Sequence, residues 1–318
     1  HIRGRNRNNP VLLCLHGGPG FPMIGFMDAV QRPWEDYFTV VQWDQRQTGK
    51  SYNQADDDKP LTVQQFISDT EEVIQYLREY LDKDKLFLMG LSWGSVLGMH
   101  MVKRHPDWLH TYIGVGQVVN LMDNERVMYE RLLSHAKKQK KDEVITKLEA
   151  IAPYPNPVCP EKSYADNAGY VRNELSRLAG ESLMHHLLSD DAINMINLDR
   201  AISPHLSLTD LSNAVFEINE GAFTAFNKEL MNIDLPKEVG SLFKAPIFFF
   251  TGTHDWTTPG VLSDKWFSRI SAPYKELVHF KESSHAVLND EPGKILIALV
   301  NKVLPFANSE TGKGVNDA

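Results

Sequence analysis

The sequence of 318 residues predicts an α/β fold with a doubly wound, mostly parallel sheet and an inserted helical lid. Short apolar runs, continuous rather than alternating, are separated by amphipathic stretches, as expected for strands covered by helices on both faces. This alternation of apolar runs and amphipathic stretches stops at about residue 118 and resumes near residue 240. The stretch between these two positions has a helical pattern. We therefore expect a core at residues 1–117 and 241–306, a helical cap at 118–240 and a flexible tail at 307–318.

The individual elements follow from hydrophobic periodicity. Apolar runs predict six strands, at Val11–Leu15, Phe38–Trp43, Leu86–Met89, Tyr112–Val115, Ile247–Thr251 and Glu276–Phe280. Apolar residues at helical spacing predict core helices at Thr62–Leu81, Ser92–Arg104 and Pro292–Val303. The cap is expected to contain helices at Asn124–Gln139, Tyr164–Leu178, Ser182–Ile196 and Ser212–Met231.

The charge, the cysteine content and the apolar runs of the chain argue against several classes of protein. A formal charge of −8 argues against nucleic acid as a partner, because phosphate binding requires a basic surface. Two cysteines without metal-site spacing favour a reducing compartment, so we expect a cytoplasmic protein. No apolar run is long enough to span a bilayer and no signal peptide is visible, although the chain begins at His1 rather than Met. The oligomeric state is not indicated.

The stretch Gly90-Leu-Ser92-Trp-Gly94 has the pattern of a nucleophile elbow. A sharp turn from strand to helix exposes the serine hydroxyl and brings the residues at minus two and plus two almost into contact. Glycine at both of these positions relieves the crowding. The alternative is a glycine-rich turn without chemistry, which the flanking strand and helix disfavour. Ser92 is therefore the candidate nucleophile.

A serine nucleophile needs a base and an acid that orients it. In this architecture they follow the serine in the order acid, then histidine, on loops at the carboxyl edge of the sheet. Asp255 follows the second-last strand and His285 follows the last. His254 is the nearest competitor among the 12 histidines, and Asp123 is a minor alternative for the acid.

The oxyanion hole is expected at the end of the first apolar strand, in His16-Gly-Gly18-Pro-Gly20. Glycines there let backbone N–H groups approach a substrate oxygen. The amides of Gly18 and Trp93 would converge on the developing charge. The alternative is that these glycines only form a tight turn.

Five segments together resemble the proline iminopeptidase (prolyl aminopeptidase) branch of the α/β-hydrolases. They are HGGPG at 16–20, WDQRQTGKS at 43–51, GLSWGS at 90–95, GTHD at 252–255 and SSH at 283–285. The resemblance covers about residues 10–118 and 240–305 and is weak through the cap. It implies the α/β-hydrolase fold, with Ser92, Asp255 and His285 as the catalytic triad and Gly18 and Trp93 as oxyanion donors.

Three departures from the family pattern stand out. Gln47 replaces the first glycine of the family's D-Q-R-G-x-G-x-S, in a segment where Arg46 is expected to brace loops. Only ten residues precede Val11, where the family has a hairpin. The family holds the substrate's amine with lid glutamates, and Glu174, Glu217 and Glu220 are candidates here, although a helical glutamate is more often solvated.

These observations predict a serine hydrolase without cofactor or metal that acts through an acyl-enzyme on a small-molecule or short-peptide substrate. The first expectation is an aminopeptidase that releases N-terminal residues. The first alternative is a carboxylesterase or other acyl hydrolase or acyltransferase, because the machinery does not choose its leaving group. An alternative of another class is a ligand-binding receptor on a hydrolase scaffold.

Overall fold

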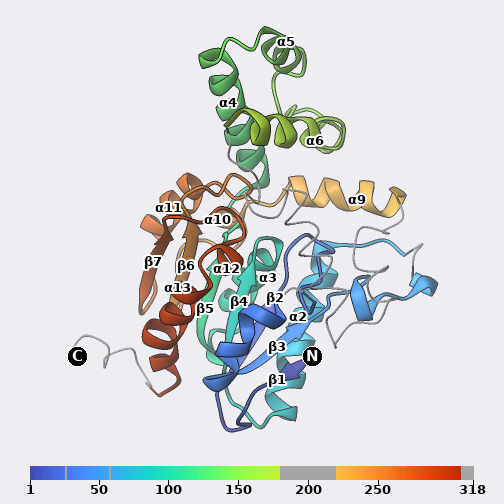
Figure 1. Cartoon of the computed structure of the whole chain (residues 1–318). Helices are drawn as coiled ribbons and strands as arrows, with labels where there is room; N and C mark the ends of the chain where they lie inside the picture. Colours follow the sequence, from blue (N-terminus) through green and yellow to red (C-terminus); the bar gives the residue numbers. More distant parts are fainter. Residues whose placement is uncertain (26, 57–58, 180–219, 309–318) are drawn as a thin grey trace.

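The computed structural model describes residues 1–25, 27–56, 59–179 and 220–308, and it confirms the predicted fold class (Figure 1). A seven-stranded sheet has the order β1-β3-β2-β4-β5-β6-β7. Only β1 (Ile2–Arg3) is antiparallel, to β3, and the other neighbours pair in parallel. The six predicted strands are present as β2 (Val11–Leu15), β3 (Thr39–Trp43), β4 (Leu86–Leu91), β5 (Leu109–Val115), β6 (Ile247–Gly252) and β7 (Lys275–Phe280).

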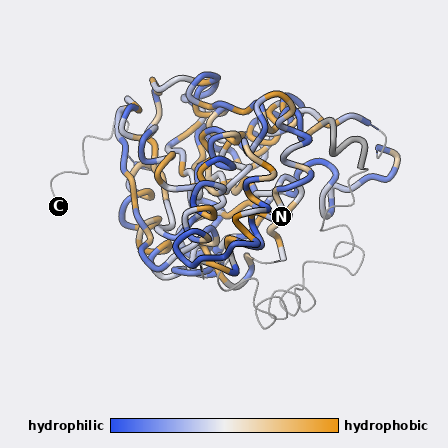
Figure 2. Tube along the Cα trace, turned by 90° about the horizontal axis from the view of Figure 1, so that it is seen from above, coloured by the Kyte–Doolittle hydropathy of each residue, from blue (hydrophilic) through white to orange (hydrophobic). Residues whose placement is uncertain are grey.

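Helices cover both faces of the sheet. One apolar layer packs the sheet against α2 (Val63–Tyr80), α3 (Trp93–Arg104) and α11 (Gly260–Arg269). The opposite layer contains residues of α12 (Val287–Asp290), α13 (Pro292–Ala298) and the segment Leu299–Val303 that continues it. Seen from above, the hydrophobic stretches run through the middle of the molecule (Figure 2). The strand residues alternate between these two layers, as two-sided burial requires.

The helical segment between β5 and β6 includes α4 (Leu121–Lys138), α5 (Asp142–Ala150), α6 (Pro160–Ala179), α9 (Glu220–Met231) and α10 (Leu235–Glu238). Figure 1 shows α4, α5 and α6 at the top of the view, away from the sheet. The sequence-based prediction missed strand β1, the longer helices α5 and α11, and the four-residue helices α1 (Asp28–Gln31), α10 and α12. The helix expected at Ser182–Ile196 lies outside the described residues, as does the first part of the one expected at Ser212–Met231. The cap boundaries themselves stay a prediction.

The two ends of this helical segment meet beside the sheet. Leu235 N donates to Val119 O at 2.9 Å, and Asn120 and Asp234 form an isolated antiparallel bridge. Helix α9 lies on the core near the elbow, where the ring of Phe226 is 5.4 Å from that of Phe66 and 5.7 Å from that of Trp93. The helical segment is thus anchored at both ends and along α9.

Close backbone approach explains the elbow glycines. A Cβ atom on Gly90 would lie 2.5 Å from the Gly94 carbonyl oxygen, and one on Gly94 would lie 2.2 Å from that of Leu15. Both distances are far below van der Waals contact. Only glycine at these positions lets β4, α3 and the end of β2 come together without moving the backbone.

His16 joins the turn after β2 to the loop after β3. Its Nε2 accepts from the Gln45 amide at 2.9 Å, so the proton of the neutral ring is on Nδ1, which donates to Gly17 O at 2.9 Å. The Gln45 side chain donates to His16 O and accepts from Trp93 Nε1, both at 2.9 Å. Burial lowers the pKa of His16 to about 4. The ring therefore acts as a neutral structural link between the first turn and the elbow.

None of the helices in the described ranges combines the length and the hydrophobicity that a membrane-spanning helix requires.

Replacing Gly94 with alanine should lower the free energy of unfolding by about 1–3 kcal/mol, because the new methyl group collides with the Leu15 backbone. Gly169→Ala is the matched control. It lies within α6 with no atom within 4 Å of the added Cβ, and it should stabilise by about 0.5–1 kcal/mol. Urea unfolding measures both, and equal effects would contradict the close packing at the elbow.

The free energy of unfolding should fall as the pH drops from about 6.5 to about 4, because unfolded His16 takes up a proton before the buried ring does. The stabilisation that neutral His16 gives to the folded state is fully present above about pH 6.5 and amounts to about 3 kcal/mol at most. It is lost as the pH falls toward 4. Burial also lowers the pKa of His110 to about 4, so the wild type carries both contributions. His16→Asn should have the shallower pH dependence in urea titrations, and unchanged slopes would reject this role.

Candidate active site

Ser92 sits at the tip of the turn between β4 and α3. Its backbone has φ 51° and ψ −120°, a strained combination for a residue with a Cβ. Ser92 N donates to Val115 O at 2.9 Å, and the side chain does not cap the helix that follows. The hydroxyl group is therefore not used in local structure and is held at the carboxyl edge of the sheet.

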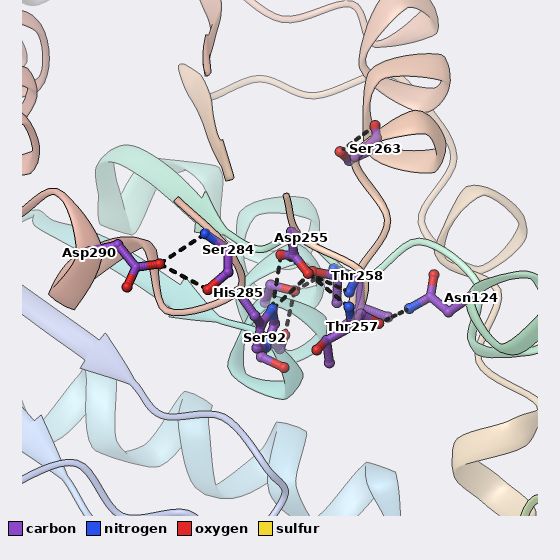
Figure 3. A network of polar contacts seen from close by, with 12 residues as sticks. Ser92, Asn124, Asp255, Thr257, Thr258, Ser263, Ser284, His285 and Asp290 are labelled. Carbon is purple, nitrogen blue, oxygen red and sulfur yellow. Dashed lines mark hydrogen bonds and ion pairs between the residues drawn. The ribbon is translucent and has the colours of Figure 1, made fainter. Parts of the chain in front are cut away.

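His285 and Asp255 are in direct contact. His285 Nδ1 lies 2.9 Å from Asp255 Oδ2. The Asp255 side chain has no exposed surface, and that of His285 is 14% exposed. The other carboxylate oxygen, Oδ1, accepts from the amides of Thr257 and Thr258, each at 2.9 Å, and Thr258 Oγ1 donates to Oδ2 at 2.8 Å. Three donors thus hold a buried carboxylate against one side of the imidazole (Figure 3).

The neighbourhood of Gly116 joins this pair to Ser92. A Cβ on Gly116 would lie 3.1 Å from His285 Cε1 and 3.2 Å from Asp255 Oδ2. Gly116 directly follows Val115, whose carbonyl accepts from Ser92 N. Figure 3 shows the side chains of Ser92, His285 and Asp255 in one cluster. The three residues, separated by up to 193 positions in the chain, therefore meet at one edge of the sheet.

The loop that carries His285 is held in place by hydrogen bonds to Asp290 and Glu291. The amide and the hydroxyl of Ser284 both donate to Asp290 Oδ2 at 2.9 Å, as Figure 3 shows. Ser283 Oγ donates to Glu291 at 2.8 Å. A Cβ on Gly252 would lie 2.1 Å from Ser284 O, so the end of β6 passes this loop in close contact. These contacts orient the imidazole without involving its reactive nitrogen.

The two expected oxyanion donors lie beside the serine. Gly18 has φ 108°, a backbone conformation that favours glycine, and the neighbouring Gly17 passes close enough that a Cβ there would lie 3.1 Å from Ser92 Cβ. Trp93 is the first residue of α3, where amide groups have no intrahelical partner. In the part of the chain that the structure describes, neither amide donates a hydrogen bond. Both are available for a substrate oxygen.

The competing residues lie elsewhere. The side chain of His254 is exposed, and only its backbone contacts the site loop, at Ser283 O. Asp123 lies on α4 and forms an ion pair with Arg126 at 2.9 Å. Among the described residues, no hydrogen bond or ion pair joins either side chain to His285.

A cavity of about 350 Å³ opens in front of Ser92. Core residues form one part of its wall and residues of α4, α6 and α9 form the rest. Its lining is Gly18, Pro19, Ser92, Trp93, Val96, Val118, Leu121, Glu125, Tyr164, Arg172, Asn227, Leu230, Met231, Thr257 and Thr258. The volume suits a small ligand.

None of the expected lid glutamates is seen in this cavity. Glu174 pairs with Arg177 on α6 and does not line it. Glu217 lies outside the described residues, and Glu220 begins α9 with a side chain that is not described. The carboxylate that does line the cavity is Glu125, on α4. This part of the lid prediction gains no support.

Glu125 could have been found from the sequence. It lies three and four positions before Met128 and Tyr129, which are buried on the same face of α4. A carboxylate on an apolar helix face is unusual unless it is paired. Burial raises the pKa of Glu125, an effect that the nearby Arg172 opposes.

The side chains of the WDQRQTGKS segment stabilise the loop after β3. Arg46 forms two hydrogen bonds to Asp69 of α2, at 2.7 and 2.6 Å, in line with the bracing expected of it. Gln47 has φ 57°, which explains why the family pattern has glycine there. Its side chain exchanges two 3.0 Å hydrogen bonds with the Asn53 backbone, which offset the strained conformation.

Within the described ranges, no group of three or more His, Cys, Asp or Glu side chains is placed to hold a metal ion.

Comparison with known proteins identifies the family. The family model described as alpha/beta hydrolase fold matches residues 10–292. A probable aminopeptidase, YbaC, of Bacillus subtilis is 32% identical over 92% of this chain and 88% of its own. A probable proline iminopeptidase of Leptolyngbya boryana is 24% identical over 96% and 89%.

Solved structures show the same fold. A proline iminopeptidase-related protein from Thermus thermophilus has a TM-score of 0.62 at 20% identity and covers 94% of this chain and 90% of its own. A thermophilic esterase from Thermogutta terrifontis has a TM-score of 0.59 at 16% identity, covering 96% and 92%. The resemblance drawn from the five sequence motifs is therefore confirmed: the chain belongs to the alpha/beta hydrolase fold family, has relatives named aminopeptidase and proline iminopeptidase, and is a hydrolase enzyme.

Proposed function

We propose that this hydrolase cleaves its substrate through an acyl-enzyme on Ser92. His285 accepts the proton of the Ser92 hydroxyl as the oxygen attacks a carbonyl carbon, and Asp255 stabilises the imidazolium that forms. The amides of Gly18 and Trp93 bind the oxyanion. His285 then protonates the leaving group, and water releases the acyl product. The observation that carries the proposal is the 2.9 Å contact between His285 Nδ1 and Asp255 Oδ2 beside the strained Ser92 turn.

The first-choice reaction is the release of an N-terminal residue from a short peptide, as in an aminopeptidase of the proline iminopeptidase type. The relative named as a probable aminopeptidase, 32% identical over most of both chains, supports this choice. The cavity of about 350 Å³ suits a substrate of this size.

Hydrolysis of a carboxylic ester is the second candidate. It is favoured by the state of Glu125, the carboxylate that lines the cavity in the described part of the chain. Glu125 accepts from Tyr154 Oη at 2.6 Å and also from Arg172, so its charge is already compensated rather than open to a substrate ammonium group. Proline p-nitroanilide and p-nitrophenyl acetate separate the two reactions. An active esterase that does not cleave the anilide would remove the peptidase assignment.

Ser92→Ala should reduce turnover of either substrate by about 10⁴-fold or more, because the attacking oxygen is lost. A fluorophosphonate probe should label wild type at Ser92, as mapped by mass spectrometry, and should not label the variant. Ser95→Ala, at a buried hydroxyl that accepts from Val118 N, is the control and should still react with the probe. Labelling at another serine would refute the assignment.

Asp255→Asn should lower kcat by up to about 10⁴-fold with little change in global stability, since an amide cannot stabilise the imidazolium. Thr258→Val removes one of the donors to Asp255 Oδ2 and should cost much less, about tenfold. Steady-state kinetics with p-nitrophenyl acetate measures both. Near-wild-type activity of Asp255→Asn would show that Asp255 is not the orienting acid.

A further inference from the structure

A partly buried ion pair forms part of the wall of the Ser92 cavity. Arg172 Nη2 of α6 contacts Glu125 Oε1 of α4, and the Arg172 guanidinium carbon lies 5.3 Å from the centre of the Tyr164 ring. Tyr154 Oη donates to the other Glu125 oxygen at 2.6 Å. Neither charged residue belongs to the triad or the oxyanion hole, so the mechanism does not account for them.

Hydrogen-bonding capacity is unevenly distributed in this pair. Both oxygens of Glu125 already accept a bond from a fixed side chain. A guanidinium group has five N–H donors, and one is engaged by Glu125. The pair therefore has more donors than acceptors to offer, which suits an acceptor group on the substrate.

The exposed fractions of the two side chains also favour an acceptor group of the substrate as the partner of this pair. The side chain of Arg172 is 21% exposed, whereas that of Glu125 is 1% exposed. A molecule in the cavity can reach the guanidinium group more readily than the carboxylate. The planar N–H fork of arginine matches a carboxylate, with which it can form two parallel hydrogen bonds.

Helix α9 contributes a second polar group to the cavity wall. Asn227 of α9 lines the cavity and is 4% exposed, and among the described residues its Oδ1 has no hydrogen-bond partner. A buried amide oxygen without a partner is costly, and an N–H or O–H donor of the substrate, rather than its carboxylate, would satisfy it.

We propose that Arg172 binds a carboxylate group of the substrate while the scissile carbonyl lies at Ser92, so that the preferred substrates are small carboxylates. This inference rests on the proposed acyl-transfer function of the same cavity. The carboxylate has two possible sources, which are the C-terminus of a short peptide on the leaving-group side or a second acid group on the acyl side. Glu125 holds the guanidinium group in place, and so does Tyr164.

Binding to Ser92→Ala tests the carboxylate without requiring catalysis. Prolyl-alanine is compared with prolyl-alanine amide, and monomethyl glutarate is compared with dimethyl glutarate, by isothermal titration. The acid of one pair should bind about 10- to 100-fold more tightly than its neutral partner, as expected for bonds to a charged group. The pair that shows the preference identifies the source. Equal affinities in both pairs would overturn the proposal, even if Ser92 proves to be the nucleophile.

Variants test whether Arg172 is the source of the preference for the acid over its neutral partner. Glu125→Gln combined with Arg172→Gln removes both charges together and should abolish the preference for the acid, whereas Arg126→Gln, at an exposed arginine of the same lid, should retain it. If the double variant does not fold, Arg172→Lys keeps the charge without the planar fork and should reduce the preference several-fold. A preference that survives in a folded double variant would contradict the assignment.

Glu125→Gln alone separates carboxylate binding from ammonium binding. Arg172 stays cationic in this variant, so the preference for the acid should remain. A folded Glu125→Gln variant that binds prolyl-alanine and its amide with equal affinity would contradict the assignment of the carboxylate to Arg172.

Discussion

The turn at Ser92 is the constraint on which the rest of this structure depends. A residue with a Cβ is held at φ 51° because β4, α3 and the end of β2 approach one another more closely than any side chain at Gly90 or Gly94 would permit. The strain is stable only because the packing around it leaves no alternative. That packing directs the hydroxyl out of local structure and toward the cavity.

The same close approach brings the other parts of the site to this edge. The His16 ring links the turn after β2 to Gln45, and Gln45 binds the Trp93 indole, so hydrogen bonds join the first glycine-rich turn to the elbow. On the far side, Gly252 lets the His285 loop cross the end of β6. The site is therefore assembled by backbone contacts between loops, and the polar contacts to Asp255 refine its geometry.

The cavity combines two chemically different walls. The core wall holds the groups proposed for bond cleavage, Ser92, Gly18 and Trp93, while the wall formed by α4 and α6 holds the compensated pair of Glu125 and Arg172. The groups proposed for bond cleavage thus lie apart from the pair proposed for substrate recognition, an arrangement expected where one fold supports many activities. The peptidase and esterase assignments share the first wall and differ only in what the second one binds.

The sequence by itself determined the six strands β2 to β7, the elbow and the order of Ser92, Asp255 and His285, because apolar runs and glycine positions report local backbone conformation. It did not reveal the two-residue strand β1. It also pointed to the turn that carries Gly18. Only the tertiary structure decided which lid residues face the cavity. Glu174 follows the helical pattern as Glu125 does, yet one pairs with Arg177 outside the cavity and the other is buried inside it. The physical reason is that the convergence of side chains from α4, α6 and α9 depends on how the helices pack, and hydrophobic periodicity within each helix does not encode that packing.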